Sequence, residues 1–280
     1  MLHRLPTAGA LAAAIFLLPS PAPAIARPTF VSINACTDQL LVSFADPEQI
    51  LGITRYALDP VQSPVAVQAA RLPVVSGTAE EVMATRPDIV LAGRFTRRAT
   101  REFIRAQGLR IVEYDAARSL DEAKRQIAAV AALVGHPERG GDAIDAIDAA
   151  VARARGAVAA GGRPAVLPLQ RRGWISGRDT LLTSLIEAVG LRNVGAAFSS
   201  GLGRQVSLEA IVALKPDYLL TSGSGRAEDQ GSALLQHPAL LALYPPSRRL
   251  AVPDRLVFCG GPSLAAAIDA LAAEAGKARR

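Results

Sequence analysis

Short runs of β-branched and aliphatic residues alternate with longer helical patterns along the chain. Strand-like runs lie at 30–33, 50–54, 89–92 and 110–114, and apolar residues recur at helical spacing between them, as at 39–45 and 98–107. Strands that alternate with helices in this way form mostly parallel sheets. The pattern therefore predicts an α/β fold.

One helix-to-strand pattern occurs twice. The first copy, TAEEVMATRPDIVLAG, begins at Thr78, and the second, SLEAIVALKPDYLLTSG, begins at Ser207. In the first copy, Thr78 and Glu81 are spaced as a capping box, so a helix is expected to begin there. Pro87 is expected to end this helix before a buried strand. The repeat predicts two similarly built lobes.

The longest helical stretch lies between the two copies. A further capping box, Ser119 with Glu122, begins it, and Gly135-His136-Pro137 interrupts it. A second helix of about 22 residues follows, which makes it roughly 33 Å long. We expect an N-terminal lobe at 27–137, a connecting helix at 138–161 and a C-terminal lobe at 162–280. Two lobes on such a strut leave a cleft between them, and clefts of this kind are favoured ligand sites.

Residues 1–26 predict a secretory signal peptide rather than part of the fold. A basic start at His3-Arg4 precedes an apolar run at 8–18, which is too short to span a bilayer, and Ala24-Ile25-Ala26 offers small residues at a cleavage site. Cys36 lies too far beyond the apolar run to suit lipid attachment. We therefore expect the mature protein to be soluble and exported.

Composition and charge argue against several classes of protein. The chain has 31 Lys and Arg against 25 Asp and Glu, a formal net charge of +6, but its basic residues are scattered, so no nucleic-acid partner is expected. Its three histidines include His136 and His237, each of which precedes a proline. No nucleophile is marked out beside a base, and so few histidines disfavour a protein-built metal site. We expect neither catalysis nor a resident metal or cofactor.

Four kinds of segment then point to one family. They are VSINACTDQLL at 31–41, the two glutamate-containing repeats, WISGRDTLLTSLIEAVGLRNVG at 174–195, and RLVFCGGP at 255–262. In this order and spacing the chain resembles the periplasmic solute-binding proteins of ABC importers for cobalamin and ferric siderophores, the class III type with a helical backbone. The resemblance implies two α/β lobes joined by a helix, little closure on ligand binding, and a periplasmic monomer that serves a permease dimer.

The resemblance also implies that one exposed glutamate on each lobe docks onto arginines of the permease. Glu80 and Glu209 occupy those positions. Each could instead serve only its own helix, because an acid in the first turn is stabilised by the helix dipole by about 0.3–1 kcal/mol. A permease with two related halves needs matching charge at two points, so the pair favours docking.

Residues at the carboxyl ends of the strands are the candidates for ligand binding, because ligands of parallel α/β sheets meet the loops there. The candidates are Asn34, Cys36, Tyr56, Arg94, Phe95, Arg97, Arg171, Trp174, Ser222, Arg226 and Phe258. Arg55 and Arg172 also lie at strand ends, and we expect at least half of the arginines to face solvent. Trp174, the sole tryptophan, is expected to line the cleft rather than the core.

The arginines favour an anionic ferric siderophore or similar metal chelate, because guanidinium groups bind carboxylate or catecholate oxygens by paired hydrogen bonds. Cobalamin or haem is the alternative, since a broad macrocycle favours aromatic walls. Only 4% of the residues are aromatic, and glycine stands at 93 and 203, so we expect the cleft to offer few aromatic walls. An exported α/β enzyme that uses the cleft, or a sensor that passes its ligand to a receptor, is a weaker alternative.

Cys36 and Cys259 each follow a strand that ends at the cleft, one in each lobe. An oxidising compartment permits a disulfide between them, which would close a loop of more than 200 residues. The alternative is two separate buried thiols that lie too far apart to bond. The sequence leaves both open.

Overall fold

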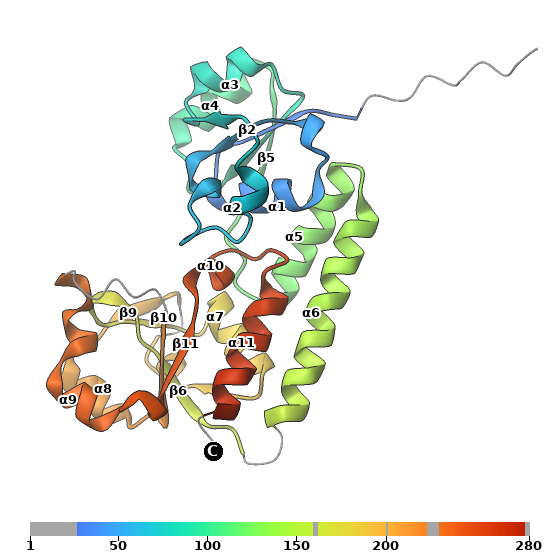
Figure 1. Ribbon diagram of the computed structural model, residues 1–280. Helices are drawn as coiled ribbons and strands as arrows, with labels where there is room; N and C mark the ends of the chain where they lie inside the picture. The colour runs from blue at the N-terminus through green and yellow to red at the C-terminus, as the bar shows by residue number, and fades with distance from the viewer. Residues whose placement is uncertain (1–26, 159–161, 200, 223–229, 278–280) are drawn as a thin grey trace, which may run out of the picture.

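The computed structural model describes residues 27–158, 162–199, 201–222 and 230–277. The predicted signal peptide, residues 1–26, lies outside the described residues. The chain forms two α/β lobes, one above the other in Figure 1, and the long helix α6 (Pro137–Val158) runs beside both. Within the described residues, no helix is both long and apolar enough to cross a membrane.

The N-terminal lobe is built on a five-stranded parallel sheet with the order β3-β2-β1-β4-β5. The strands are β1 (Phe30–Ser32), β2 (Ile50–Thr54), β3 (Val74–Val75), β4 (Ile89–Gly93) and β5 (Arg110–Tyr114). Every residue of β1 and β4 is buried. Such continuous burial is typical of a parallel sheet whose two faces are both covered.

The helices of this lobe include one that begins earlier than its apolar pattern predicts. α1 (Ala35–Phe44) starts directly after Asn34, whose Oδ1 accepts hydrogen bonds from the backbone N–H groups of Cys36 at 2.9 Å and Thr37 at 3.4 Å. This cap satisfies two otherwise unpaired donors. The other helices are α2 (Ala66–Ala69), α3 (Ala79–Thr85), α4 (Arg98–Ala106), and the 3-10 helices η1 (Pro47–Gln49) and η2 (Arg55–Leu58).

The C-terminal lobe has a four-stranded parallel sheet, β11-β10-β6-β8, and a small antiparallel pair, β7-β9. Its strands are β6 (Ala165–Pro168), β7 (Trp174–Ser176), β8 (Arg192–Asn193), β9 (Gly203–Gln205), β10 (Tyr218–Ser222) and β11 (Arg249–Val252). Its α-helices are α7 (Leu181–Ala188), α8 (Leu208–Leu214), α9 (Pro238–Leu243), α10 (Asp254–Val257) and α11 (Leu264–Lys277). Its 3-10 helices are η4 (Arg171–Gly173), η5 (Val194–Ala197), η6 (Gln230–Gln236) and η7 (Pro246–Arg248).

The repeated sequence forms the same helix-to-strand unit in both lobes. The hydroxyls of Thr78 and Ser207 each accept a hydrogen bond from the backbone N–H three residues on, at the start of α3 and α8. Arg86 and Lys215 end these helices in the left-handed region, with φ of 51° and 45°. In each copy a proline and a strand of the parallel sheet follow, so the prediction of two similarly built lobes is confirmed.

The two capping boxes form only in part. Both cap hydroxyls accept the expected backbone N–H. The glutamate carboxylates, however, reach past the cap: Glu81 accepts from the N–H of Ser76 at 2.6 Å, and Glu122 from the N–H of Arg118 at 2.7 Å. The chain therefore folds back over each helix start and presents an earlier donor to the carboxylate.

A layer of three helices joins the lobes. α6 packs against both α5 (Leu120–Leu133) of the N-terminal lobe and α11 of the C-terminal lobe, which lie one above the other along it (Figure 1). Ile127, Ile147 and Ile268, one from each helix, are fully buried in one core. A Cβ at Gly140 would lie 2.6 Å from the Cβ of Ala131, so the close approach of α5 and α6 requires glycine there. The two lobes are thus set on a shared, rigid helical support.

Candidate ligand-binding cleft

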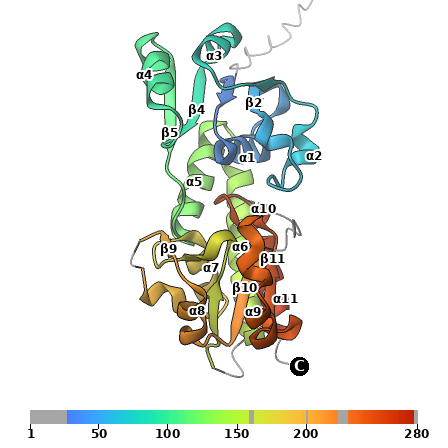
Figure 2. The same ribbon diagram turned by 90° about the vertical axis from the view of Figure 1, so that its left-hand side faces the viewer.

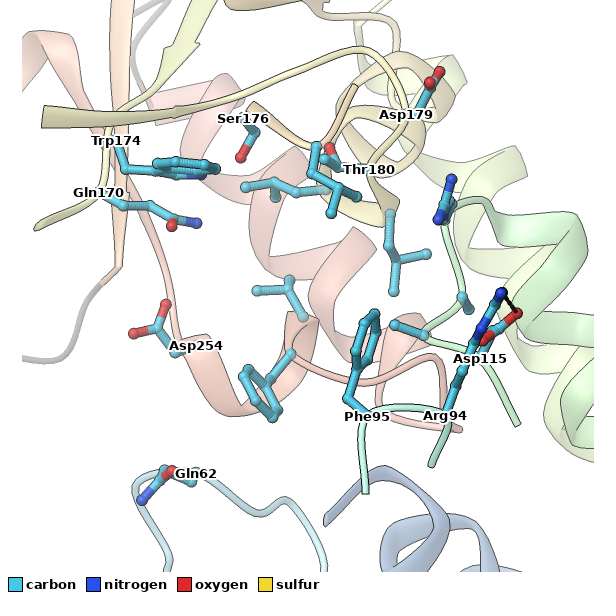
Figure 3. A pocket seen from close by; sticks show the side chains of 18 of the residues that line it. Gln62, Arg94, Phe95, Asp115, Gln170, Trp174, Ser176, Asp179, Thr180 and Asp254 are labelled. Atoms are coloured by element: carbon cyan, nitrogen blue, oxygen red, sulfur yellow. Dashed lines mark hydrogen bonds and ion pairs between the residues drawn. The ribbon is translucent and has the colours of Figure 1, made fainter. Parts of the chain in front are cut away.

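A cavity of about 810 Å³ lies between the lobes. The loop after β4 contributes Phe95 from the N-terminal lobe, and Figure 3 shows it facing Gln170, Trp174 and Thr180 of the C-terminal lobe. Lining residues that the sequence did not single out include Gln62, Asp115, Arg118, Asp179, Thr180, Leu202 and Asp254. These residues come together only where the two lobes meet, and no local sequence pattern predicts how the lobes meet.

A second cavity, of about 890 Å³, lies against the N-terminal lobe. Its wall includes the predicted residues Asn34, Tyr56 and Arg97. Gln62, Phe95 and Phe258 line both cavities, so the two form one continuous cleft. Each is as large as a site for a drug-sized ligand, so together they offer room for a larger molecule.

Aromatic side chains gather on this cleft. They are Tyr56, Phe95, Phe103, Trp174 and Phe258, and each is between 39% and 80% exposed. The expectation that the cleft offers few aromatic walls is therefore wrong. Aromatic residues are scarce in the whole chain, but the topology brings these five, from both lobes, to one place. Trp174 lines the cleft, as predicted.

The predicted arginines divide between the cleft and its surroundings. Arg94 and Arg171 line the first cavity, and Arg97 lines the second. Arg94 pairs with Asp115 at 3.1 Å, but both side chains are more than half exposed, so the pair is weak and can be exchanged. Arg55 instead lies over the ring of Tyr56, 5.5 Å from its centre. Arg172, which is among the described residues, lines neither of these two cavities.

Two further candidates can be placed only in part or not at all. Ser222 is the last residue of β10. Arg226 lies outside the described residues.

The two cysteines form a disulfide across the lobes. Cys36 lies in the first turn of α1, and Cys259 follows α10. Their Cα atoms are 5.2 Å apart, within the range that a disulfide spans. The alternative of two separate thiols is therefore excluded, and Cys36 contributes a covalent tie rather than a cavity wall.

Asn34 has a structural role beside its place in the cleft, since it caps α1. A Cβ at Gly93 would collide with its side-chain amide. Gly93 is therefore needed for the close approach of β4 to this cap.

A buried acid lies beneath the cleft floor. Asp38 is fully buried in α1, and burial raises its pKa to about 7. Its Oδ2 accepts a 2.5 Å hydrogen bond from the hydroxyl of Thr54, which lines the second cavity, whereas its Oδ1 has no partner among the described residues. No sequence pattern distinguished Asp38, because its burial arises only when α1 packs on β2.

The model of the family described as periplasmic binding protein matches residues 31–243. The chain belongs to this family. Members of the periplasmic binding protein family are substrate-binding transport proteins rather than enzymes.

Among relatives of this binding protein is a cobalamin-binding protein of Halobacterium salinarum, which is 27% identical over 225 residues. The match covers 75% of this chain but 58% of the relative, so the chain spans less than two thirds of that protein's length.

Solved structures share the fold of this binding protein. The apo periplasmic haem-binding protein RhuT from Roseiflexus sp. RS-1 superposes with a TM-score of 0.75 at 25% identity, over 91% of this chain and all of that one. The vitamin B12-binding protein BtuF of Vibrio cholerae superposes with a TM-score of 0.69 at 17% identity, over 91% of this chain and 98% of that one. These likenesses confirm two α/β lobes with mostly parallel sheets.

The two predicted docking glutamates of the binding protein lie at equivalent places. Glu80 is the second residue of α3 and Glu209 the second residue of α8, and both are exposed. Figures 1 and 2 show α3 on the N-terminal lobe and α8 on the C-terminal lobe. A hydrogen bond with the Ser207 side chain lowers the pKa of Glu209, so this carboxylate is charged at neutral pH.

The described residues include no group of three or more His, Cys, Asp or Glu side chains placed to hold a metal ion.

Proposed function

We propose that this protein is the periplasmic substrate-binding component of an ABC importer and delivers a metal chelate to a permease dimer as a monomer. The continuous interlobe cleft, with exposed aromatic rings and guanidinium groups, is the observation that carries this proposal. The predicted signal peptide and the family of the chain support a periplasmic location.

The aromatic walls favour a flat macrocyclic chelate, a corrin or a porphyrin, as the ligand. Trp174 and Phe95 approach the first cavity from opposite lobes, and Tyr56 and Phe103 line the second. Aromatic faces pack well on an extended planar ring. The names of the haem-binding and cobalamin-binding relatives agree with this choice. A ferric siderophore is the second candidate, which Arg94, Arg97 and Arg171 support because they can bind anionic oxygens.

A fluorescence titration of Trp174 tests the ligand class. Cobalamin, haem, ferric catecholate, ferric hydroxamate and ferric citrate are added in turn to the mature protein. We expect one macrocycle to give a saturable change with a Kd of about 1 μM or tighter. The variant Trp174→Phe is the control, since it loses the signal while calorimetry still detects binding. The ligand proposal fails if calorimetry detects no binding of any of the five.

Charge reversal of the two docking glutamates tests delivery. We expect Glu80→Lys with Glu209→Lys to lower uptake into cells about tenfold or more, because like charges would then face the permease arginines. Because Glu80 also lines the second cavity, ligand affinity is measured separately on the purified variant, and uptake is measured at saturating ligand, where a change in affinity does not limit delivery.

The matched control for this experiment is Glu48→Lys with Glu187→Lys. It makes the same change of charge at exposed positions, one in each lobe. Normal uptake by the Glu80 and Glu209 double variant, or equal loss in the control, would contradict the docking roles.

A further inference from the structure

A third cavity, of about 510 Å³, opens off the cleft beside α5, and we call it the side cavity. Its wall consists of Arg94, Tyr114, Asp115, Ala116 and Arg118 at the carboxyl ends of β4 and β5, and of Glu122, Arg125, Gln126 and Ala129 on α5. Four of these residues, Arg94, Asp115, Ala116 and Arg118, also line the interlobe cavity. A ligand in the cleft can therefore extend a group into the side cavity.

The α5 part of this wall is rigidly held. Residues 122, 125, 126 and 129 recur at helical spacing and so share one face of the helix. The other face is fixed in the core by Ile127 and Val130, which are fully buried. The Gln126 amide also donates to the backbone carbonyl of Asp115 at 2.8 Å, which ties the loop after β5 to α5.

Of the charged groups that line the side cavity, the carboxylates have hydrogen-bond or ion-pair partners, whereas two of the guanidinium groups do not. Glu122 already accepts the backbone N–H of Arg118 at 2.7 Å, and Asp115 pairs with Arg94. Among the described residues, the guanidinium groups of Arg118 and Arg125 make no hydrogen bond or ion pair. The wall holds three guanidinium groups, of Arg94, Arg118 and Arg125, against the carboxylates of Asp115 and Glu122, so an excess positive charge remains that an anion can neutralise.

The chemistry of the wall also limits what the side cavity can hold. Among the described residues that form it, there is no large aliphatic side chain and one aromatic ring, that of Tyr114. A macrocycle would find little apolar surface there. A short polar arm, in contrast, would meet N–H donors.

We infer that the side cavity is a subsite for an oxyanionic arm, a carboxylate or a phosphate, of the chelate whose body lies in the cleft. This inference rests on the proposed function. Arg118 and Arg125 bind the oxyanion by charge-assisted hydrogen bonds, which are stronger than those between neutral groups. The exposed pair of Arg94 with Asp115 opens to let Arg94 join them. Arg118 and Arg125 thereby select chelates that carry an oxyanionic arm over those that lack one.

Matched pairs of ligands test this selectivity by calorimetry. Haem is compared with its dimethyl ester, which lacks only the two carboxylate charges, and cobalamin with cobinamide, which lacks the phosphate-bearing nucleotide arm. We expect the intact protein to prefer the oxyanion-bearing member of one pair by about tenfold or more, as for a charged hydrogen bond. The pair that shows the preference identifies the oxyanion as a carboxylate or a phosphate.

Two double variants then assign the preference to the side cavity. In Arg118→Gln with Arg125→Gln, we expect the preference to fall to about twofold or less, with the affinity for the member without the oxyanion unchanged. The control, Arg71→Gln with Arg110→Gln, removes the same charge from exposed positions that line none of the three cavities. An unchanged preference in the first variant, or an equal loss in the control, overturns the inference.

A direct measurement separates failure of this subsite from failure of the proposed function. Glutarate and inorganic phosphate are titrated into the protein without any chelate, and backbone amide resonances are followed by NMR. Shifts centred on Arg118, Arg125 and Gln126 that the Arg118→Gln with Arg125→Gln variant lacks would support the subsite even if no macrocycle binds. No such shift up to about 10 mM anion, which would occupy even a site of millimolar affinity, overturns it.

Discussion

Replacing Cys36 and Cys259 by alanine is expected to lower the free energy of unfolding by about 5 kcal/mol. The bond joins residues 223 positions apart, so it removes much of the conformational freedom of the unfolded chain. Urea unfolding of the oxidised protein and of the variant, followed by circular dichroism, measures the difference. Alanine introduces no new hydroxyl beside the nearly fully buried Cys259.

Reduced wild-type protein is the control for this experiment, since it lacks the bond but keeps both sulfur atoms in place. We expect it to unfold at nearly the same urea concentration as the alanine variant. If reduced and oxidised protein unfold together, the bond contributes no stability and the prediction is wrong.

The replacement Asp38→Asn is expected to raise stability at pH 8 by up to about 4 kcal/mol. Burial raises the pKa of Asp38 from its ordinary value of 3.8 to about 7 in the folded protein. Between these values the folded protein keeps a proton that the unfolded chain loses. The stability that this proton provides is complete below about pH 4 and is lost as the pH rises through 7. Asparagine stays neutral and avoids this loss.

Urea unfolding of both proteins at pH 5 and pH 8 checks this prediction. We expect the gain of the asparagine variant over wild type to be larger at pH 8 than at pH 5. The control is Asp88→Asn, because hydrogen bonds from Thr29 lower the pKa of Asp88, so its carboxylate favours the folded state at both pH values. Equal differences at pH 5 and pH 8 for Asp38→Asn would contradict the prediction.

Local sequence signals predicted much of the fold correctly. The hydroxyl caps at Thr78 and Ser207 and the apolar strand runs are short-range features, so the repeated unit could be read directly. Strands such as β3 and β8 have only two residues each and hold their place through pairing with a neighbour. Two residues are too few to show a hydrophobic pattern, so neither strand can be predicted from the sequence.

The candidate site was predicted less completely, because it is made where two lobes meet. Strand-end residues such as Arg94, Phe95 and Trp174 could be named, since parallel topology sends them to one edge. Phe103 lies within α4 and Gln62 in the loop after η2, away from any strand end. Only the three-dimensional packing brings Phe103 and Gln62 to the cleft. The same packing also decides that Cys36 and Cys259 lie close enough to bond.

The lobes are connected by the helical support around α6 and by the Cys36–Cys259 bond. These connections have a consequence for the kinetics of ligand capture. A cleft held open at two anchor points needs little reorganisation to receive a ligand, so association should be limited mainly by diffusion and orientation. Differences in affinity among competing chelates then appear in their residence times. Release cannot rely on a free hinge, so under the proposed delivery to a permease the membrane partner supplies the work that parts the lobes.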